Sequence, residues 1–199
     1  DEPLAALDKK LREDTQFELV DIQEKLGTTF IVVTHDQEEA MTLAGRIGIM
    51  DAGRLVQVDA PRRLYERPKS SFVADFLGTI SFVEGVVVSR DKANITISGD
   101  LKICAACDDD LPVGRAVKLA IRPEKIYLSR TKSGNLNEIE VVVEDLAYLG
   151  FATNYRVKTA SGQMFKLLQQ QRRSLEAPLS WGETGYVHFD PQDVIVLQH

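Results

Sequence analysis

From residue 80 to the last residue, the chain is a succession of short segments in which apolar and polar side chains alternate. Turn-forming runs such as SGD, LPVG and TKSGN separate these segments. A period of two is typical of strands that bury one face, so the pattern predicts an all-β barrel or sandwich. The expected strands lie in FVEGVVVS, ANITIS, LKICAA, AVKLAI, KIYLS, EIEVVVEDL, TNYRVK, QMFKLL, GYVHF and VIVLQ.

The first part of the chain follows a different pattern. Apolar residues at helical spacing predict one long helix over residues 7–26, which Gly27 would end. The apolar, β-branched run at 29–34 is typical of a strand that is buried on both faces. Asp36 with Glu39 fits a capping box at the start of a second helix. This order of helix, strand and helix predicts an α/β domain.

The remaining elements of the first part are short. The stretch RIGIMDAGRLVQVDAP predicts two strands joined by a turn at 51–53, and helical pieces are expected at 61–65 and 72–77. We therefore predict a domain boundary that separates an α/β domain at 1–79 from an all-β domain at 80–199.

Composition limits the kinds of function that this chain can have. It has 199 residues, 44% of them hydrophobic and 27% charged, with a net charge of −6. These values are ordinary for a cytosolic globular protein, and neither half has the excess of basic residues that nucleic-acid binding requires. Cys104 and Cys107 form a single C-x-x-C, and without a second ligand pair we expect them to be inert.

His35 stands where the apolar run ends and a strongly charged stretch begins. Because open α/β sheets bind ligands at the carboxyl ends of their strands, His35 is a candidate ligand-binding residue. Two simpler interpretations remain open at this point. His35 could merely be a polar residue that closes a strand, and the acidic pair Asp1-Glu2 could be a solvated surface.

The motif DEPLAALD, followed further along the chain by VVTHD, resembles the later part of the nucleotide-binding domain of ABC transporter ATPases, over residues 1–68. The resemblance implies that Asp1 holds Mg²⁺ through water and that Glu2 is the base for the attacking water. It also implies that Asp8, in the D-loop AALD, reaches toward the partner's site. His35 would contact the γ-phosphate of ATP. Phosphoryl transfer needs such a metal and such a carboxylate.

Other motifs of that family are absent from this sequence. There is no Walker A loop of the G-x-x-x-x-G-K-[ST] type and no LSGGQ motif. The chain is therefore expected to be a C-terminal fragment that neither binds ATP tightly nor hydrolyses it alone. ATP and Mg²⁺ are the cofactors expected of the full-length protein.

The second half resembles the TOBE domain, an OB-fold-like regulatory barrel found in importer ATPases. The resemblance rests on AIRPEKIYL at 120–128 and EDLAYLGFATNYRV at 144–157. It implies that this half regulates the ATPase or pairs with its own copy. Within it, Arg122-Pro123-Glu124 is expected to be a strand-ending turn with a structural role. Trp181 is expected to pack in the core or at its rim, and a groove between subunits is the alternative.

The stretch at residues 4–41, from LAALD to EEAM, resembles the ATPase subunits of bacterial spermidine/putrescine importers. Sugar, sulfate and ferric-ion importers share much of this framework. The resemblance implies a second copy of the subunit, transmembrane permease subunits and, indirectly, a periplasmic substrate-binding protein as partners. It also implies a peripheral location on the cytoplasmic side of the inner membrane. Nucleic acid is not expected as a partner.

Two other functions are compatible with the sequence. The chain could be a standalone regulatory or dimerisation protein, in which Asp1, Glu2 and His35 would be relics. It could also be an OB-fold module that binds single-stranded nucleic acid or an oligosaccharide. The slight excess of acidic residues over 80–199 argues against nucleic acid.

Overall fold

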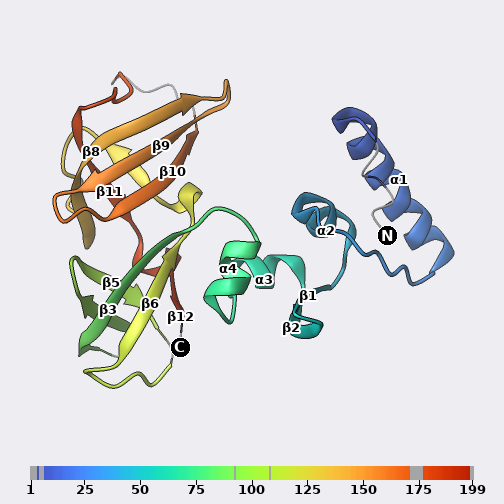
Figure 1. Ribbon diagram of the computed structural model, residues 1–199, viewed down its shortest axis with the longest axis horizontal. Coiled ribbons are helices and arrows are strands. Elements are labelled where there is room, and N and C mark those ends of the chain that lie inside the picture. The colour runs from blue at the N-terminus through green and yellow to red at the C-terminus, as the bar shows by residue number, and fades with distance from the viewer. Residues whose placement is uncertain (1–3, 5–6, 92, 108, 171–176, 198–199) are drawn as a thin grey trace. The chain divides into compact units, whose positions relative to one another are not determined.

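The computed structural model describes the chain except residues 1–3, 5–6, 92, 108, 171–176 and 198–199 (Figure 1). The chain divides into two compact units, Asp1–Gly78 and Thr79–His199. Helices predominate in the first unit and strands in the second (Figure 1). Within the part of the chain that is described, no helix is long and apolar enough to cross a membrane.

The first unit begins with the long helix α1, Lys9–Leu26, which confirms the expected helix. Asp8 caps its N-terminus by accepting a hydrogen bond from the Leu11 N–H at 3.0 Å. Gly27 ends the helix with a φ of 61°, a left-handed conformation that glycine adopts without steric cost. The predicted C-terminal stop at Gly27 is therefore confirmed.

The helix α2, Gln37–Leu43, is followed by the antiparallel strands β1, Ile47–Asp51, and β2, Arg54–Asp59. The turn between the strands has a φ of 46° at Ala52 and 76° at Gly53. Two positive φ angles are typical of the hairpin turn whose twist matches that of its strands. The expected hairpin is confirmed.

Two short helices complete the first unit, α3, Pro61–Glu66, and α4, Ser71–Phe76. Both were expected from the sequence. They bury apolar side chains against the hairpin in a small core. That core consists of Ile47, Ile49, Leu64, Val73 and Leu77.

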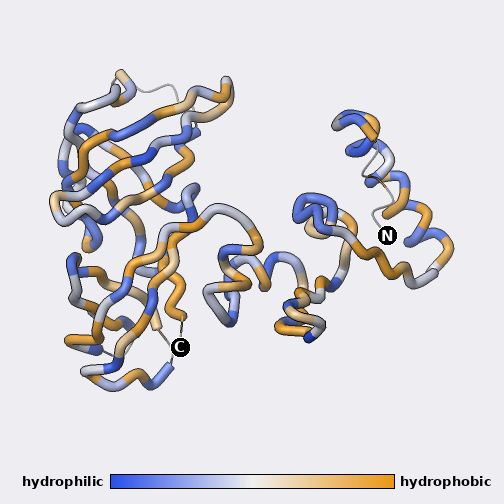
Figure 2. Tube along the Cα trace, in the orientation of Figure 1, coloured by the Kyte–Doolittle hydropathy of each residue, from blue (hydrophilic) through white to orange (hydrophobic). Residues whose placement is uncertain are grey.

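The strand expected at 29–34 is not present. This stretch has no regular secondary structure, and the side chain of Ile31 is 91% exposed. Figure 2 shows the corresponding apolar segment of the tube between α1 and α2. A strand needs hydrogen-bonding neighbours, and no described segment of the first unit pairs with this one. The expectation of a buried parallel strand, and with it of an α/β sheet, is therefore wrong for the described residues.

The second unit contains two five-stranded antiparallel sheets. One sheet has the order β12-β6-β3-β4-β5 and the other has the order β10-β9-β8-β11-β7. All ten expected strands are confirmed, and their alternating hydropathy is visible in Figure 2. The strands are β3 Ser81–Arg90, β4 Asn94–Ser98, β5 Lys102–Ala106, β6 Ala116–Ile121, β7 Tyr127–Ser129, β8 Asn137–Tyr148, β9 Ala152–Thr159, β10 Met164–Gln170, β11 Thr184–Phe189 and β12 Val194–Leu197.

Buried side chains from both sheets form one continuous core. Within it, the rings of Phe165 in β10 and Phe189 in β11 have centroids 6.3 Å apart. The all-β character of this half is confirmed. Of the barrel and the sandwich that the pattern predicted, the described strands form two sheets that share one core, because they pair in two separate sets of hydrogen bonds.

Three local expectations for the second unit have different outcomes. Arg122 is 3% exposed and precedes a short 3₁₀ turn, Pro123–Lys125, so the strand-ending turn is confirmed. Trp181 is 75% exposed, so its expected packing in the core is wrong. Cys104 and Cys107 are free thiols, and burial raises the pKa of Cys104, which favours its unreactive protonated form.

Candidate functional site

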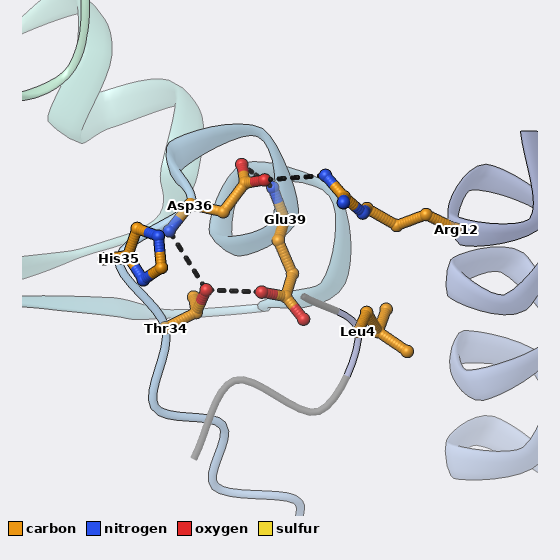
Figure 3. Close-up of a pocket in the computed structure, with 6 residues that line it drawn as sticks. All are labelled: Leu4, Arg12, Thr34, His35, Asp36 and Glu39. Carbon is orange, nitrogen blue, oxygen red and sulfur yellow. Dashed lines mark hydrogen bonds and ion pairs between the residues drawn. The ribbon is translucent and has the colours of Figure 1, made fainter. Parts of the chain in front are cut away.

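The candidate site is the turn Thr34-His35-Asp36, which leads into α2 (Figure 3). Asp36 is the N-cap of α2. Its Oδ1 accepts hydrogen bonds from the N–H groups of Glu38 at 2.9 Å and Glu39 at 3.1 Å. These bonds satisfy two helix N–H groups that would otherwise have no acceptor. The predicted cap at Asp36 is confirmed, and it fixes the main chain directly after His35.

The main chain on the other side of His35 is held by Thr34. The Thr34 hydroxyl accepts a hydrogen bond from the Asp36 N–H at 3.0 Å and donates one to the Glu39 carboxylate. Glu39 itself is 3% exposed. In a capping box this carboxylate would accept directly from the N-cap N–H. Here the hydroxyl lies between the two groups, because it can donate and accept at once.

Arg12, in α1, contacts this turn. Its Nη1 lies 3.3 Å from Asp36 Oδ2, and its Nη2 donates to the Leu7 carbonyl oxygen at 3.0 Å. The two side chains of the ion pair are 31% and 33% exposed, so water partly screens it. Arg12 thus contacts both the segment before α1 and the cap of α2, and Figure 3 shows its contact with Asp36.

These residues line a small pocket. The cavity has a volume of about 90 Å³, and its lining consists of Leu4, Arg12, Thr34, His35, Asp36 and Glu39. Pockets that hold drug-sized ligands have volumes of roughly 300–1,000 Å³. The cavity is therefore too small for a whole nucleotide, and what it can offer is a polar contact to a single small group.

The described residues do not fit a Mg²⁺ ion. No group of three or more His, Cys, Asp or Glu side chains comes close enough together among them to hold a metal. Asp36 and Glu39, the two carboxylates of the pocket, already accept hydrogen bonds from the protein. No chemical step through Mg²⁺ is therefore derived from this geometry.

The structure describes two of the four residues that were predicted to form the site, His35 and Asp8. His35 is exposed beside the pocket, as a ligand-contacting residue must be. Asp8 caps α1 and is not among the pocket residues. Asp1 and Glu2 lie outside the described residues. Sequence reasoning missed the contribution of Arg12, because it belongs to no motif that points to the turn, and it gave no role to Thr34 although that residue lies within VVTHD.

Comparison with known proteins first identifies a domain family in the second half of the chain. Residues 119–197 match the TOBE domain family. The two sheets also resemble a solved structure of ModG, described as a cytoplasmic molybdate-binding protein, with a TM-score of 0.51 and 16% sequence identity. That match covers 59% of this chain and 94% of ModG, and it shows a shared fold only.

Curated relatives then extend the similarity to the whole chain. The putrescine transport ATP-binding protein PotG of Escherichia coli is 39% identical over 99% of this chain and 54% of its own length. The spermidine/putrescine import ATP-binding proteins PotA of Fusobacterium nucleatum and Rubrobacter xylanophilus are 37% and 40% identical over 100% and 99% of this chain. Those matches cover 56% and 52% of the two PotA proteins.

The chain spans about half the length of these relatives. It is homologous to the C-terminal part of the ATP-binding proteins of polyamine ABC transporters, and it carries their TOBE domain.

Proposed function

We propose that this chain acts as the C-terminal portion of an ATP-hydrolysing subunit that drives the import of a small solute across the bacterial inner membrane. The solute that we propose is a polyamine, spermidine or putrescine. The observation that carries the proposal is the similarity to PotG and PotA, which extends over nearly all of this chain. Similarity confined to the TOBE domain would support only a regulatory module.

Within the first unit, His35 is the residue that we propose contacts the γ-phosphate of ATP. An imidazole N–H can donate a hydrogen bond to a phosphate oxygen. The main chain on both sides of His35 is held by hydrogen bonds of Thr34 and Asp36, while the imidazole itself is exposed. This combination of a fixed backbone and an accessible side chain suits a residue that must meet a ligand in one position.

Three further residues have proposed roles that rest on the family resemblance. Glu2 would orient the attacking water, Asp1 would hold Mg²⁺ through water, and Asp8 would reach toward the site of the partner subunit. When bound, Mg²⁺ neutralises phosphate charge.

For the second unit we propose a role in regulation or in pairing with a second copy of the subunit. Exposed apolar side chains near the loop between β8 and β9 support such a contact. Tyr148 is 67% exposed and Phe151 is 69% exposed. The transmembrane permease would be the other direct partner, which places the subunit at the cytoplasmic face of the membrane, and the periplasmic substrate-binding protein would act indirectly.

A chimera tests this proposal. Residues 1–199 replace the homologous C-terminal part of E. coli PotG in a strain that lacks PotG, and uptake of labelled putrescine is measured. We expect the chimera to restore uptake. We expect His35→Ala to reduce it by about 100-fold, the usual effect of removing one hydrogen-bond donor to a developing charge. Glu2→Gln should have an effect at least as large.

Arg62→Gln is the control, because Arg62 forms an ion pair with Glu66 of the same short helix, and its side chain is 87% exposed. This variant should retain uptake. A stable, membrane-associated chimera that restores no putrescine uptake would contradict the polyamine proposal. Full uptake by the His35→Ala chimera would contradict the proposed role of His35.

A further inference from the structure

We propose that Arg12 is a positioning residue that holds His35 in place by binding the cap residue Asp36. The inference depends on the proposed role of His35 for its functional meaning. Arg12 lies 24 residues from Asp36 in the sequence, so the contact exists only in the folded unit. Arg12 acts through the turn that carries His35.

The guanidinium group of Arg12 reaches two different segments of the chain. Nη1 binds Asp36 Oδ2 at 3.3 Å, whereas Nη2 binds the Leu7 carbonyl oxygen at 3.0 Å. The main-chain N–H of Arg12 also donates to the Asp8 carbonyl oxygen at 2.9 Å, within the first turn of α1. The side chain of Arg12 therefore joins Leu7, in the segment before α1, to the cap of α2.

Asp36 transmits this contact to the backbone of His35. Its other oxygen, Oδ1, accepts from the N–H groups of Glu38 and Glu39, and its own N–H donates to Thr34. The carboxylate cannot move without disturbing the first turn of α2. Any displacement of α1 relative to the turn would thus shift the peptide units that flank His35.

The small free energy of the Arg12–Asp36 ion pair favours a role in positioning the turn over a role in stabilising the whole fold. Ion pairs at partly exposed sites contribute roughly 0–1 kcal/mol, which is small beside the 5–15 kcal/mol that stabilises a typical domain. The geometry is also specific to arginine. Two guanidinium nitrogens at a fixed separation serve two acceptors at once, whereas the single ammonium group of lysine has no such fork.

The test uses the 199-residue chain with Arg12→Gln, Arg12→Lys, Asp36→Asn and the double variant Arg12→Gln/Asp36→Asn. Asparagine remains a good N-cap, so Asp36→Asn keeps the helix start and removes only the charge that faces Arg12. Two quantities are measured by NMR: amide hydrogen exchange at residues 36–39, and the ring resonances of His35, assigned by comparison with His35→Ala. Urea unfolding reports overall stability.

We expect Arg12→Gln to raise amide exchange at 36–39 by about 2- to 5-fold and to shift the His35 ring resonances. The urea midpoint should stay unchanged. Asp36→Asn should have the same effect as Arg12→Gln. The double variant should have an effect no larger than that of either single variant, because both substitutions remove the same contact. Arg12→Lys should restore the wild-type values in part. Arg62→Gln, which breaks the Arg62–Glu66 ion pair in α3, should leave both quantities unchanged.

Unchanged His35 resonances and exchange in Arg12→Gln would overturn the inference, as would additive effects in the double variant. The PotG chimera separates this failure from failure of the proposed function. Loss of uptake with His35→Ala but full uptake with Arg12→Gln would reject the positioning role alone. Full uptake with His35→Ala would reject the function of His35, while the NMR result on Arg12 would stand.

Discussion

The side-chain amide of Asn137 binds both main-chain groups of Cys104. Its Nδ2 donates to the Cys104 carbonyl oxygen, and its Oδ1 accepts from the Cys104 N–H, each at 2.8 Å. Asn137 begins β8 in one sheet, whereas Cys104 lies in β5 at the edge of the other. The amide therefore takes the place of a neighbouring strand at that edge and joins the two sheets.

Replacing Asn137 with leucine should destabilise the second unit by about 2–4 kcal/mol, because two main-chain groups of Cys104 would lose their partners at a site that is 1% exposed. Urea unfolding monitored by circular dichroism measures the change. Asn154→Ala is the matched control, since Asn154 is an exposed residue of β9. A loss below about 1 kcal/mol for Asn137→Leu would mean that water replaces the amide.

Asp8 offers a way to separate capping from any role across a dimer. Asp8→Ala should increase amide exchange at Leu11 by about fivefold, because the helix loses a cap whose usual contribution is about 1 kcal/mol. Asp8→Asn should keep the cap and leave exchange nearly unchanged. If Asp8→Asn nevertheless abolishes putrescine uptake in the PotG chimera, the charge of Asp8 has a function beyond the cap. Full uptake with Asp8→Asn would leave Asp8 with its structural role alone.

Glu183 should make the stability of the second unit depend on pH. The Arg130 guanidinium, followed by the Ser180 N–H, lowers the pKa of the Glu183 carboxyl from its ordinary value of 4.5. A lowered folded-state pKa stabilises the fold above the ordinary value, and this contribution is lost as the pH falls through the folded-state pKa. Arg130→Gln should therefore weaken the fall of the urea midpoint below pH 4.5.

The matched control for this pH effect is Arg156→Gln, which removes a looser ion pair in which Arg156 lies 3.9 Å from Asp145. Its acid profile should follow that of the wild-type chain. If the Arg130→Gln and wild-type curves are parallel from neutral pH down into the acid range, Arg130 does not stabilise ionised Glu183.

Trp181 gives a fluorescence test of the pairing that we propose for the second unit. It is the one tryptophan of the chain, so all indole emission comes from this residue. At low protein concentration, its 75% exposure should give an emission maximum typical of an indole in water and easy quenching by acrylamide. Trp181→Ser should change the free energy of unfolding by less than about 0.5 kcal/mol. A blue shift that grows with protein concentration would place Trp181 in the contact between two copies.

Local patterns were sufficient to predict most of the elements. Alternating hydropathy predicted all ten strands of the second unit, and Gly27 marked the end of α1. The cap at Asp36 and the turn at Ala52-Gly53 were also predictable. Each of these features depends on residues that are near one another in the chain and on the conformations that those residues prefer.

The run Phe30–Val33 shows where a local pattern misleads. Its composition is that of a buried strand, yet it lies exposed, because a strand forms only where another segment supplies hydrogen bonds. The sequence likewise predicted only part of the site. His35 and the cap at Asp36 were identified from their neighbours in sequence, but Arg12 was not.

The sequence by itself determined most of the helices and strands and which histidine is displayed at a capped turn, since these follow from side chains a few positions apart. Only the tertiary structure decided that the strands divide into two sheets and that Asn137 meets Cys104 across 33 residues. It also decided that Arg12 meets Asp36 across 24. Such contacts depend on which surfaces pack together, and neither local propensity nor hydropathy specifies that choice.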